Sequence, residues 1–370
     1  MEREDLEAFS KVLHEVARCA HDQRVPFYTI KEGDHHHVLS RAIKNVLGTE
    51  LAIFTYAQII DGLPTADVAW DRRLPGISGD HPIDDVHEEL CPGAMDKARE
   101  FYANWDPSIL KFDPKVVEAY NHAEPGSKPF NLRLVELVAV SLHQIGVTLF
   151  KLDLRLHNGD IESITNWRMP LSDGMIAVPA RPTLFNHPAY MDYDIYPEGL
   201  ADAVGYWAED RIIGGVSVFD RRPQADPLNP PNLFLHPCRD HVTDRVCQLR
   251  DEQQQALVDF FLSDDPSSVC PLPVLIDVQN QVRFDWMTAH TTDLIYRDIW
   301  ERKPLERDDL NFMLRRPRAD LDYPEIRQMI YHVNAQLGIP LPTEDRSPSL
   351  PPGQTTEKEE RHNLNESSTR

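Results

Sequence analysis

The sequence lacks the common signatures of several enzyme classes. It contains no G-x-G-x-x-G after a predicted strand, no G-x-x-x-x-G-K-[ST], no G-x-S-x-G and no H-E-x-x-H. These patterns cradle phosphates, expose a nucleophilic serine or hold a catalytic zinc ion. Their absence argues against the common nucleotide-binding, α/β-hydrolase and zincin chemistries.

Cysteine is scarce as well. The 370 residues include five cysteines and no C-x-x-C pair; they are Cys19, Cys91, Cys238, Cys247 and Cys270. An odd number without paired spacing argues against a disulfide framework and favours a reducing compartment. The first residues, MEREDLEAF, carry acids where a signal peptide needs a basic end and an apolar run. We therefore expect a cytoplasmic protein.

Basic residues are outnumbered. The chain has 38 Lys and Arg against 60 Asp and Glu, a formal net charge of −22. The negative electrostatic field of such a chain repels nucleic-acid phosphates and anionic membrane surfaces. The alternative is that the charge serves only to keep the chain soluble. We expect an unknown protein or small molecule as partner, neither a nucleic acid nor a membrane, and no cofactor.

Helical periodicity dominates the first 160 residues. Apolar residues recur at helical spacing in five segments, 4–20, 34–47, 50–60, 94–104 and 131–152. The last of these is the most apolar run in the chain, but charged and polar residues interrupt it, so it predicts a buried helix rather than a membrane span. Residues 62–85 mix Pro and Gly with charges and predict a long loop, with a short helix from about 84 to 90. Residues 113–121 predict another short helix, with Pro114 in its first turn.

Strand-like segments follow residue 200. Three hairpins are predicted, 204–208 with 212–219, 232–236 with 241–249, and 273–278 with 281–285. Glu209-Asp210-Arg211 forms the predicted turn of the first hairpin. Helices are expected at 251–262, 292–300, 307–314 and 323–337.

These patterns predict an α+β protein, with a helical N-terminal half packed on an antiparallel β-meander with flanking helices. We expect one integrated domain over 1–342, with the helical part at about 1–160 and the meander at about 200–300. From residue 340 the chain is rich in Pro, Ser, Thr and Glu. Residues 343–370 are therefore predicted to be a disordered tail.

Histidines gather at two places. Asp34 precedes His35, His36 and His37, but adjacent helical residues point about 100° apart, so they cannot face one ion and Asp34 is better explained as a helix cap.

The segment 236–241 (HPCRDH) offers His236, Asp240 and His241 as candidate polar or catalytic groups. Zinc accepts such ligands, but no second ligand pair stands nearby and Pro and Asp favour a turn on their own account. We therefore predict no metal site.

Acidic groups provide the remaining catalytic candidates. Glu209, Asp210 and Arg211 place paired carboxylates beside an arginine and are candidates for acid–base chemistry, or else solvated turn charges. Glu136 and His143 lie seven residues apart on one helix face and are candidates for ligand binding, unless Arg133 satisfies Glu136.

Aromatic residues crowd the segment 185–207. Tyr193, Tyr196, Tyr206 and Trp207 are candidates to line an apolar ligand pocket, or else they form the core between the two halves. Further back, His157-Asn158-Gly159-Asp160 is typical of a turn just after the long helix.

Three segments carry a resemblance: FNLRLVELVAVSLHQIGVTLFKLD, HNGDIESITNW and ADAVGYWAEDRIIGGVSVFDRR. They resemble a family of filamentous-fungal proteins without an assigned activity, over roughly residues 125–285. The resemblance implies a fungal source and no site residues.

Two functions remain open. The first is a non-catalytic interaction or scaffold protein of the cytosol, favoured by the missing catalytic signatures and the charge. The second is a small-molecule-binding accessory enzyme with an aromatic pocket that uses His, Asp and Glu as acid and base.

Overall fold

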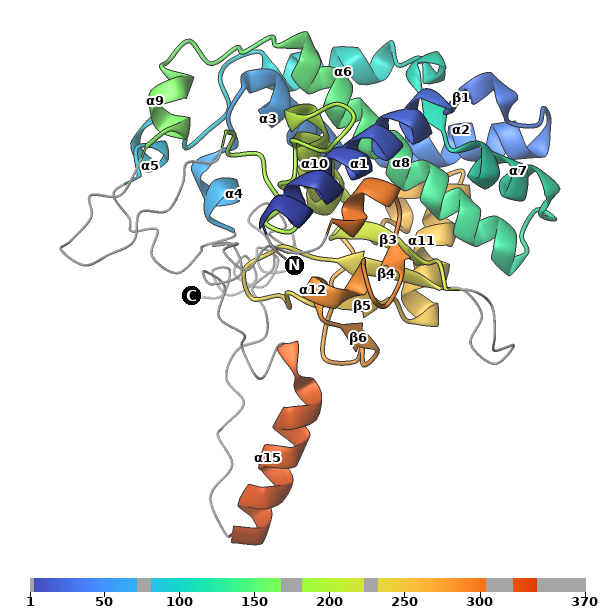
Figure 1. Cartoon of the computed structure of the whole chain (residues 1–370). Coiled ribbons are helices and arrows are strands. Elements are labelled where there is room, and N and C mark those ends of the chain that lie inside the picture. The colour runs from blue at the N-terminus through green and yellow to red at the C-terminus, as the bar shows by residue number, and fades with distance from the viewer. Residues whose placement is uncertain (1–2, 72–80, 168–181, 223–231, 304–321, 338–370) are drawn as a thin grey trace, which may run out of the picture. The chain divides into compact units, whose positions relative to one another are not determined.

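A long central helix and a five-stranded sheet organise this protein. The computed structural model describes residues 3–71, 81–167, 182–222, 232–303 and 322–337. The chain forms two compact units, Met1–Pro324 and Glu325–Arg370. In the first, helices surround α8 (Lys128–Leu152) and α10 (Leu200–Ile213), with the antiparallel sheet beside them (Figure 1). The predicted α+β class is confirmed.

The predicted N-terminal helices are present with small shifts in their ends. They are α1 (Arg3–Asp22), α2 (Asp34–Leu47), α3 (Glu50–Asp61), α6 (Ala94–Ala103) and α7 (Pro114–His122). Side-chain caps explain two of the starts: the Thr49 hydroxyl accepts from the amide of Ala52 before α3, and Asp113 accepts from Lys115 before α7. Two short 3₁₀ helices, Phe27–Thr29 and Pro107–Ile109, flank the small ribbon of β1 (Val25–Pro26) and β2 (Lys111–Phe112).

Three much shorter helices lie in a separate part of the unit. They are α4 (Ala66–Trp70), α5 (Ile83–Val86) and α9 (Ile161–Thr165). The first two fall in the segment for which a long loop was predicted, with α5 shorter than the helix expected at 84–90. All three appear together at the left of Figure 1.

The central helix α8 is a core helix. The Ser127 hydroxyl accepts from the amide of Phe130 at its start, and Asp153 adopts a left-handed conformation, φ 51°, at its end. The helix is long and apolar enough to cross a membrane, but 78% of its most apolar window is buried inside the protein. This burial agrees with the predicted core helix.

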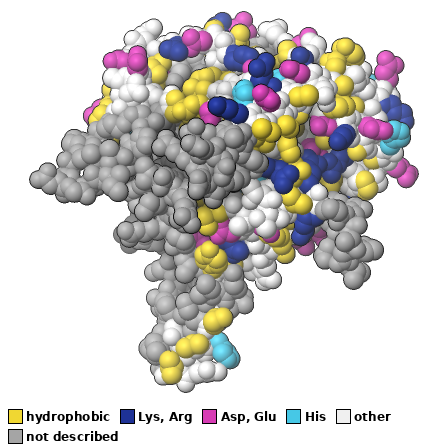
Figure 2. Space-filling model, viewed as in Figure 1, with side chains coloured by type: hydrophobic (Ala, Val, Ile, Leu, Met, Phe, Trp, Pro, Cys, Tyr) yellow, Lys and Arg dark blue, Asp and Glu magenta, His cyan; other side chains and the backbone are white. Residues whose placement is uncertain are grey.

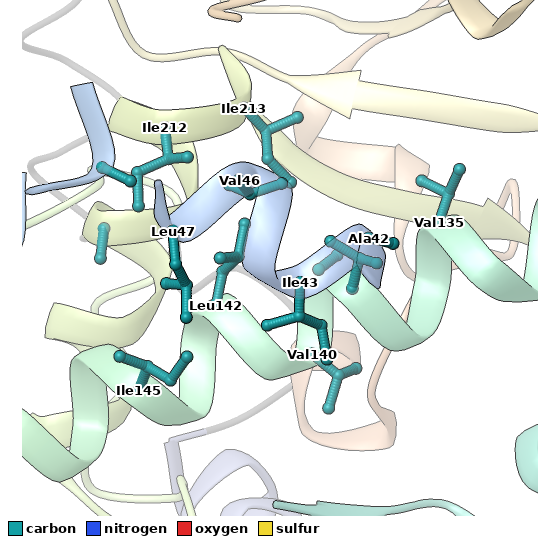
Figure 3. Close-up of a cluster of buried hydrophobic side chains, with 14 of the residues drawn as sticks. Ala42, Ile43, Val46, Leu47, Val135, Val140, Leu142, Ile145, Ile212 and Ile213 are labelled. Atoms are coloured by element: carbon teal, nitrogen blue, oxygen red, sulfur yellow. The ribbon is translucent and has the colours of Figure 1, made fainter. Parts of the chain in front are cut away.

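Helices α8 and α10 approach each other closely because glycines face each other at the crossing. A Cβ atom added to Gly146 would lie 3.2 Å from the Cα of Gly205, and one added to Gly205 would lie 2.8 Å from the His143 ring. Helix α2 packs on the same pair: Ile43 and Leu47 point toward Leu142 of α8, with Ile212 of α10 nearby (Figure 3). Small residues at this contact make room for the buried side chains around it.

The predicted hairpin at 204–219 is wrong in its first half. Residues 200–213 form α10, and only Val216–Asp220 is a strand, β3. All of the helix after Leu200 is buried, so no amphipathic period marks it in the sequence, and its Val, Ile, Tyr and Trp residues favour a strand locally. Gly214, with φ 108°, ends the helix in the left-handed conformation and lets the chain enter the sheet.

The sheet is an antiparallel meander with one added strand. Its order is β6-β5-β4-β3-β7, from β3, β4 (Leu233–His236), β5 (Val246–Gln248), β6 (Arg283–Phe284) and β7 (Ile295–Tyr296). The register pairs Val216 with His236 and Phe219 with Leu233. Phe234 of β4 pairs with Gln248 of β5, so the second predicted hairpin is confirmed in outline, with its second strand limited to Val246–Gln248. Helix α11 (Asp251–Leu262) has the predicted bounds.

Two further predictions in this half are wrong. Residues 273–278 do not pair with β6; the amide of Val274 donates to the carbonyl of Ile213, and β6 pairs with β5. Residues 292–300 are not a helix, because Leu294 adopts φ 55° and Tyr296 pairs with Phe219 in the sheet. A short helix α12 (Trp286–Ala289) and the 3₁₀ helices η3 (Pro266–Ser268) and η4 (Ile299–Arg302) complete this half.

The second unit contributes α15 (Pro324–Leu337), close to the predicted 323–337. The predicted helix at 307–314 and the predicted tail at 343–370 lie outside the described residues. On the face shown in Figure 2, acidic and basic side chains are interspersed wherever the surface is described. The net negative charge therefore does not gather into one patch on that part of this face.

Candidate metal centre

Four side chains with metal-binding atoms meet where α3 ends. Asp61, His87, Cys91 and His157 each offer one donor atom, and all of these atoms lie within 4.8 Å of one another. Asp61 and His87 are buried, whereas Cys91 and His157 are partly exposed. We call these residues the donor cluster; it is the one such group found among the described residues.

Asp61 is held at the last position of α3. Gly62 follows it with φ 103°, so the helix stops there and the carboxylate faces the neighbouring loops. The Oδ2 atom accepts a 2.7 Å hydrogen bond from the amide of Cys91. Within the described residues the other oxygen, Oδ1, is buried and accepts no hydrogen bond.

His87 ends α5 between two oxygen atoms. Its Nδ1 lies 2.9 Å from the carbonyl oxygen of Pro64, and its Nε2 lies 3.0 Å from Oδ2 of Asp61. A carbonyl only accepts, and so does an ionised carboxylate, whereas a neutral imidazole carries one N–H. Since Nδ1 donates to Pro64, Nε2 either carries the second proton of an imidazolium and donates to Asp61, or turns its lone pair toward a cation held between the two groups.

Cys91 and His157 come from opposite sides of the cluster. Cys91 lies in the turn before α6, where the left-handed Gly93 starts the helix. The amide of His157 donates to the carbonyl of Asp61, which fixes the segment after α8 against the end of α3. The Cys91 Sγ then lies 3.4 Å from the His157 Nδ1.

Gly159 permits this position of His157. A Cβ atom added there would lie 2.4 Å from the Nε2 of the imidazole. The His157-Asn-Gly segment is thus the predicted turn, and it also places a donor atom. Asp160 caps the next helix, α9, by accepting from the amide of Ser163.

The electrostatic environment of the donor cluster favours a bound cation over a reactive thiol. Burial, together with the neighbouring Asp61 carboxylate, raises the pKa of Cys91 to about 11. Burial alone would raise the pKa of Asp61, but hydrogen bonds from His87 and Cys91 lower it below its ordinary value. Burial, followed by the charge of His87, lowers the pKa of His157. At neutral pH the centre therefore holds a carboxylate, a neutral imidazole at His157 and a thiol.

The spacing of the donor cluster suits zinc. Zn–N, Zn–O and Zn–S bonds of about 2.0 to 2.3 Å in a tetrahedron place ligand atoms about 3.3 to 3.8 Å apart. The observed 3.0 Å and 3.4 Å contacts are close to that range. One thiolate and one carboxylate would also neutralise Zn²⁺, so that the buried centre carries no net charge.

The predicted acid–base group lies elsewhere, inside α10. Glu209 accepts from the amide of Ser217 at 2.6 Å and pairs with Arg297 at 2.5 Å. Asp210 accepts from the amide of Cys238, and Arg211 pairs with Asp71. The prediction of a solvated turn is wrong, because both carboxylates are fully buried and each accepts hydrogen bonds from other residues of the protein.

The candidates at 236–241 are also separated. His236 is buried on β4 with its Nδ1 3.2 Å from the hydroxyl of Tyr190. Asp240 and His241 lie beyond the strand, and they contact each other at 3.2 Å. Among the described residues, none of the three belongs to a group that could hold a metal ion.

Three of the four predicted ligand-binding aromatics, Tyr196, Tyr206 and Trp207, are buried against other rings. Tyr190 and Tyr206 stack with ring centroids 4.4 Å apart, and Tyr196 lies 5.7 Å from Tyr206. Trp207 packs against Phe185, whereas Tyr193 is exposed. The buried rings therefore pack on one another, as expected if they form the core between the two halves.

Glu136 and His143 do not pair. Glu136 is bonded to Arg133, as the sequence alternative proposed, and to Arg221. The Nε2 atom of His143 lies 2.9 Å from a carboxylate oxygen of Asp202, and its Nδ1 atom lies 3.4 Å from the guanidinium of Arg297. Asp298 accepts from Arg297 in turn. We call Glu209, Arg297, Asp298, His143 and Asp202 the Arg297 network.

The histidines of α2 behave as helix residues. His35 is buried with its Nε2 3.0 Å from the carbonyl of Ala123, and the rings of His36 and His37 are 6.0 Å apart. Within the described residues these three histidines are not part of a group that could hold a metal ion.

Sequence reasoning missed most of the donor cluster. The sequence marks His157 only as part of a predicted turn, and no motif marks Asp61, His87 or Cys91 as metal ligands. The one local signal is the spacing of His87 and Cys91, four residues apart; the other ligands are far away in the chain. No protein-family model, no curated protein and no solved structure matches this chain, so the function is argued from geometry.

Proposed function

We propose that this protein binds one zinc ion in the donor cluster and acts as a non-catalytic interaction protein whose fold the metal supports. The observation that carries the proposal is the meeting of Asp61, His87, Cys91 and His157 within 4.8 Å, from three separate segments. Four protein ligands fill a tetrahedron and leave no position for water or substrate, which is typical of structural zinc.

The orientation of His87 supports the same proposal. A metal ion between its Nε2 and the Asp61 carboxylate satisfies both groups at once, while the carbonyl of Pro64 holds the other ring nitrogen at 2.9 Å. A backbone carbonyl is a frequent outer partner of a metal-binding histidine, since it fixes the tautomer and the ring orientation. Zinc binding would release the thiol proton of Cys91, because the thiolate is the ligand.

A cysteine nucleophile is the competing chemistry for the same atoms. The 3.4 Å contact between Cys91 and His157 has the spacing of a thiol–imidazole pair. However, a pKa raised to about 11 keeps the thiol protonated, whereas a nucleophile needs a lowered value. Among the described residues, no hydrogen bond orients the second ring nitrogen of His157. The aromatic-pocket enzyme has no comparable arrangement in its favour.

Metal analysis tests the proposal. Full-length protein dialysed against excess zinc and then against buffer is expected to keep one zinc per chain, measured by elemental analysis. Cobalt in its place is expected to give the intense visible bands of a tetrahedral thiolate complex. Cys91→Ser should lose both signals, and Cys270→Ser, an exposed thiol, should lose neither. Equal binding by the two variants, or no zinc in the wild type, would overturn the proposal.

A further inference from the structure

A small apolar cluster lies beside the donor cluster and apart from the main core. Leu63, Ile83 and Ile164 are its buried members, each 4% exposed or less. Four partly buried residues pack on it: Ala69, Trp70, Ile161 and Leu184. We call these seven residues the satellite cluster.

The elements that carry the satellite cluster are short. Helices α4, α5 and α9 have five, four and five residues. Isolated helices of this length do not form in water, because the conformational entropy lost in the first turn exceeds the free energy gained from its hydrogen bond. Three buried apolar side chains also contribute little hydrophobic stabilisation compared with the main core, which runs through α2, α8 and α10. The region therefore belongs to the part of a fold that opens first.

The donor cluster joins this region to the main body. Asp61 ends α3, His87 ends α5, and His157 precedes α9 by four residues. Backbone bonds run along the same seam: the amide of Ala66 donates to the carbonyl of His87 at 2.8 Å, and that of His157 to Asp61 at 2.9 Å. A metal ion bound to all four donors would have to be released before these segments separate.

We infer that zinc occupancy controls the local order of the region formed by α4, α5 and α9, without changing the order of the main core. This inference rests on the proposed zinc site. A ligand that binds only the closed form lowers the population of the open form by the factor 1 + [L]/Kd. At zinc one hundred times above its Kd, local opening of these segments should be about 100-fold rarer.

Hydrogen exchange of the full chain tests the inference, with and without a zinc chelator, and with native mass spectrometry of the same samples. Amide protection in 61–71, 82–91 and 156–166 is expected to rise about 100-fold at that zinc concentration. In the chelated protein α8 and α10 are expected to stay well protected while these three segments exchange much faster, and amides of α8 and α10 that exchange by global unfolding should also slow when zinc binds. The wild-type comparison needs no variant, and Cys91→Ser should show no zinc response while Cys270→Ser should match the wild type.

The outcomes separate the two proposals. One bound zinc, with the three segments exchanging much faster than α8 and α10 in the chelated protein and slowing when zinc binds, supports the inference. One bound zinc with no change in the three segments, or a chelated protein in which α8 and α10 lose protection together with them, overturns the inference and leaves the zinc site standing. No bound zinc overturns both.

Discussion

The Arg297 network and the donor cluster are both buried polar groups, yet they are satisfied differently. In the network Arg297 bonds to Glu209 at 2.5 Å and to Asp298 at 3.0 Å, and His143 lies between Asp202 and Arg297, so each carboxylate has a donor within the protein. In the donor cluster, Oδ2 of Asp61 faces His87 and the amide of Cys91, but the buried Oδ1 accepts no hydrogen bond from the described residues.

The difference shows how to separate a structural network from a ligand site. Burial and perturbed pKa values occur in both places, so neither property distinguishes them. The balance of donors and acceptors does: within the described residues the carboxylates of the network have their donors, whereas the donor cluster leaves one buried carboxylate oxygen, Asp61 Oδ1, without a donor, and a cation would satisfy it. The following predictions test that contrast.

The largest expected effect comes from breaking the network. Arg297→Ala leaves Glu209 buried without its partner, and the free energy of unfolding should fall by about 3 to 5 kcal/mol. Urea denaturation measures the loss. Zinc stoichiometry should not change in the folded fraction.

The double variant Glu209→Gln with Arg297→Met is the control for that experiment. It removes both charges and should recover part of the lost stability, because Glu209 is no longer a buried charge without its partner, while Asp298 keeps its ion pair with Arg24 at 2.9 Å. A double variant no more stable than Arg297→Ala would contradict the account of the network as a balanced pair.

Zinc should stabilise the wild type by an amount that depends on its concentration. At one hundred times the Kd the gain is about 2.7 kcal/mol, since zinc binds the folded form. Thermal denaturation at increasing zinc concentrations measures it. Cys91→Ser should show no dependence on zinc, and a rising melting temperature in that variant would argue against Cys91 as a ligand.

Gly205→Ala should be destabilising although alanine favours helices. Its Cβ would lie 2.8 Å from the His143 ring, which Asp202 and Arg297 hold in place. Overpacking of this kind costs about 1 to 3 kcal/mol. His143→Ala should relieve the clash, so a double-mutant cycle in urea is expected to show coupling between the two positions. Additive effects would contradict the proposed contact.

A further prediction concerns the pH dependence of stability. Burial, with the charge of Asp298 adding to it, raises the pKa of Glu301 from 4.5 to about 7. The folded state therefore holds this proton more tightly than the unfolded state, and its contribution to stability is lost as the pH rises from about 4.5 to 7. Glu301→Gln stays neutral and should lose less stability over that interval in urea titrations.

An exposed carboxylate provides the control for Glu301. Glu100→Gln, on the surface of α6, should follow the wild-type pH profile. Parallel profiles for the wild type and Glu301→Gln would show that Glu301 does not titrate in this interval.

The sequence predicts well where local patterns decide the structure. Helix α11 has its predicted ends, and α8 shows its apolar run and its serine cap. Helix α10 was missed because its polar residues are satisfied by distant partners. The bond from Arg297 to Glu209 spans 88 positions, so a local pattern cannot distinguish a buried ion pair from an exposed turn.

The donor cluster was beyond sequence reasoning for a related reason. His87 lies 26 positions from Asp61, and His157 lies 66 positions from Cys91. Zinc motifs recognised from sequence place two ligands close together at each end. Here only His87 and Cys91 are close, and the folding of α3, α5 and α8 brings the other two to them.

X-ray absorption at the zinc edge tests the central claim most directly. The full chain loaded with one zinc is expected to show one sulfur ligand at about 2.3 Å and three nitrogen or oxygen ligands at about 2.0 to 2.2 Å. Cys91→Ser should lose the sulfur shell. A zinc ion surrounded only by nitrogen and oxygen in the wild type would contradict the account, because it would place the metal outside the cluster of Asp61, His87, Cys91 and His157.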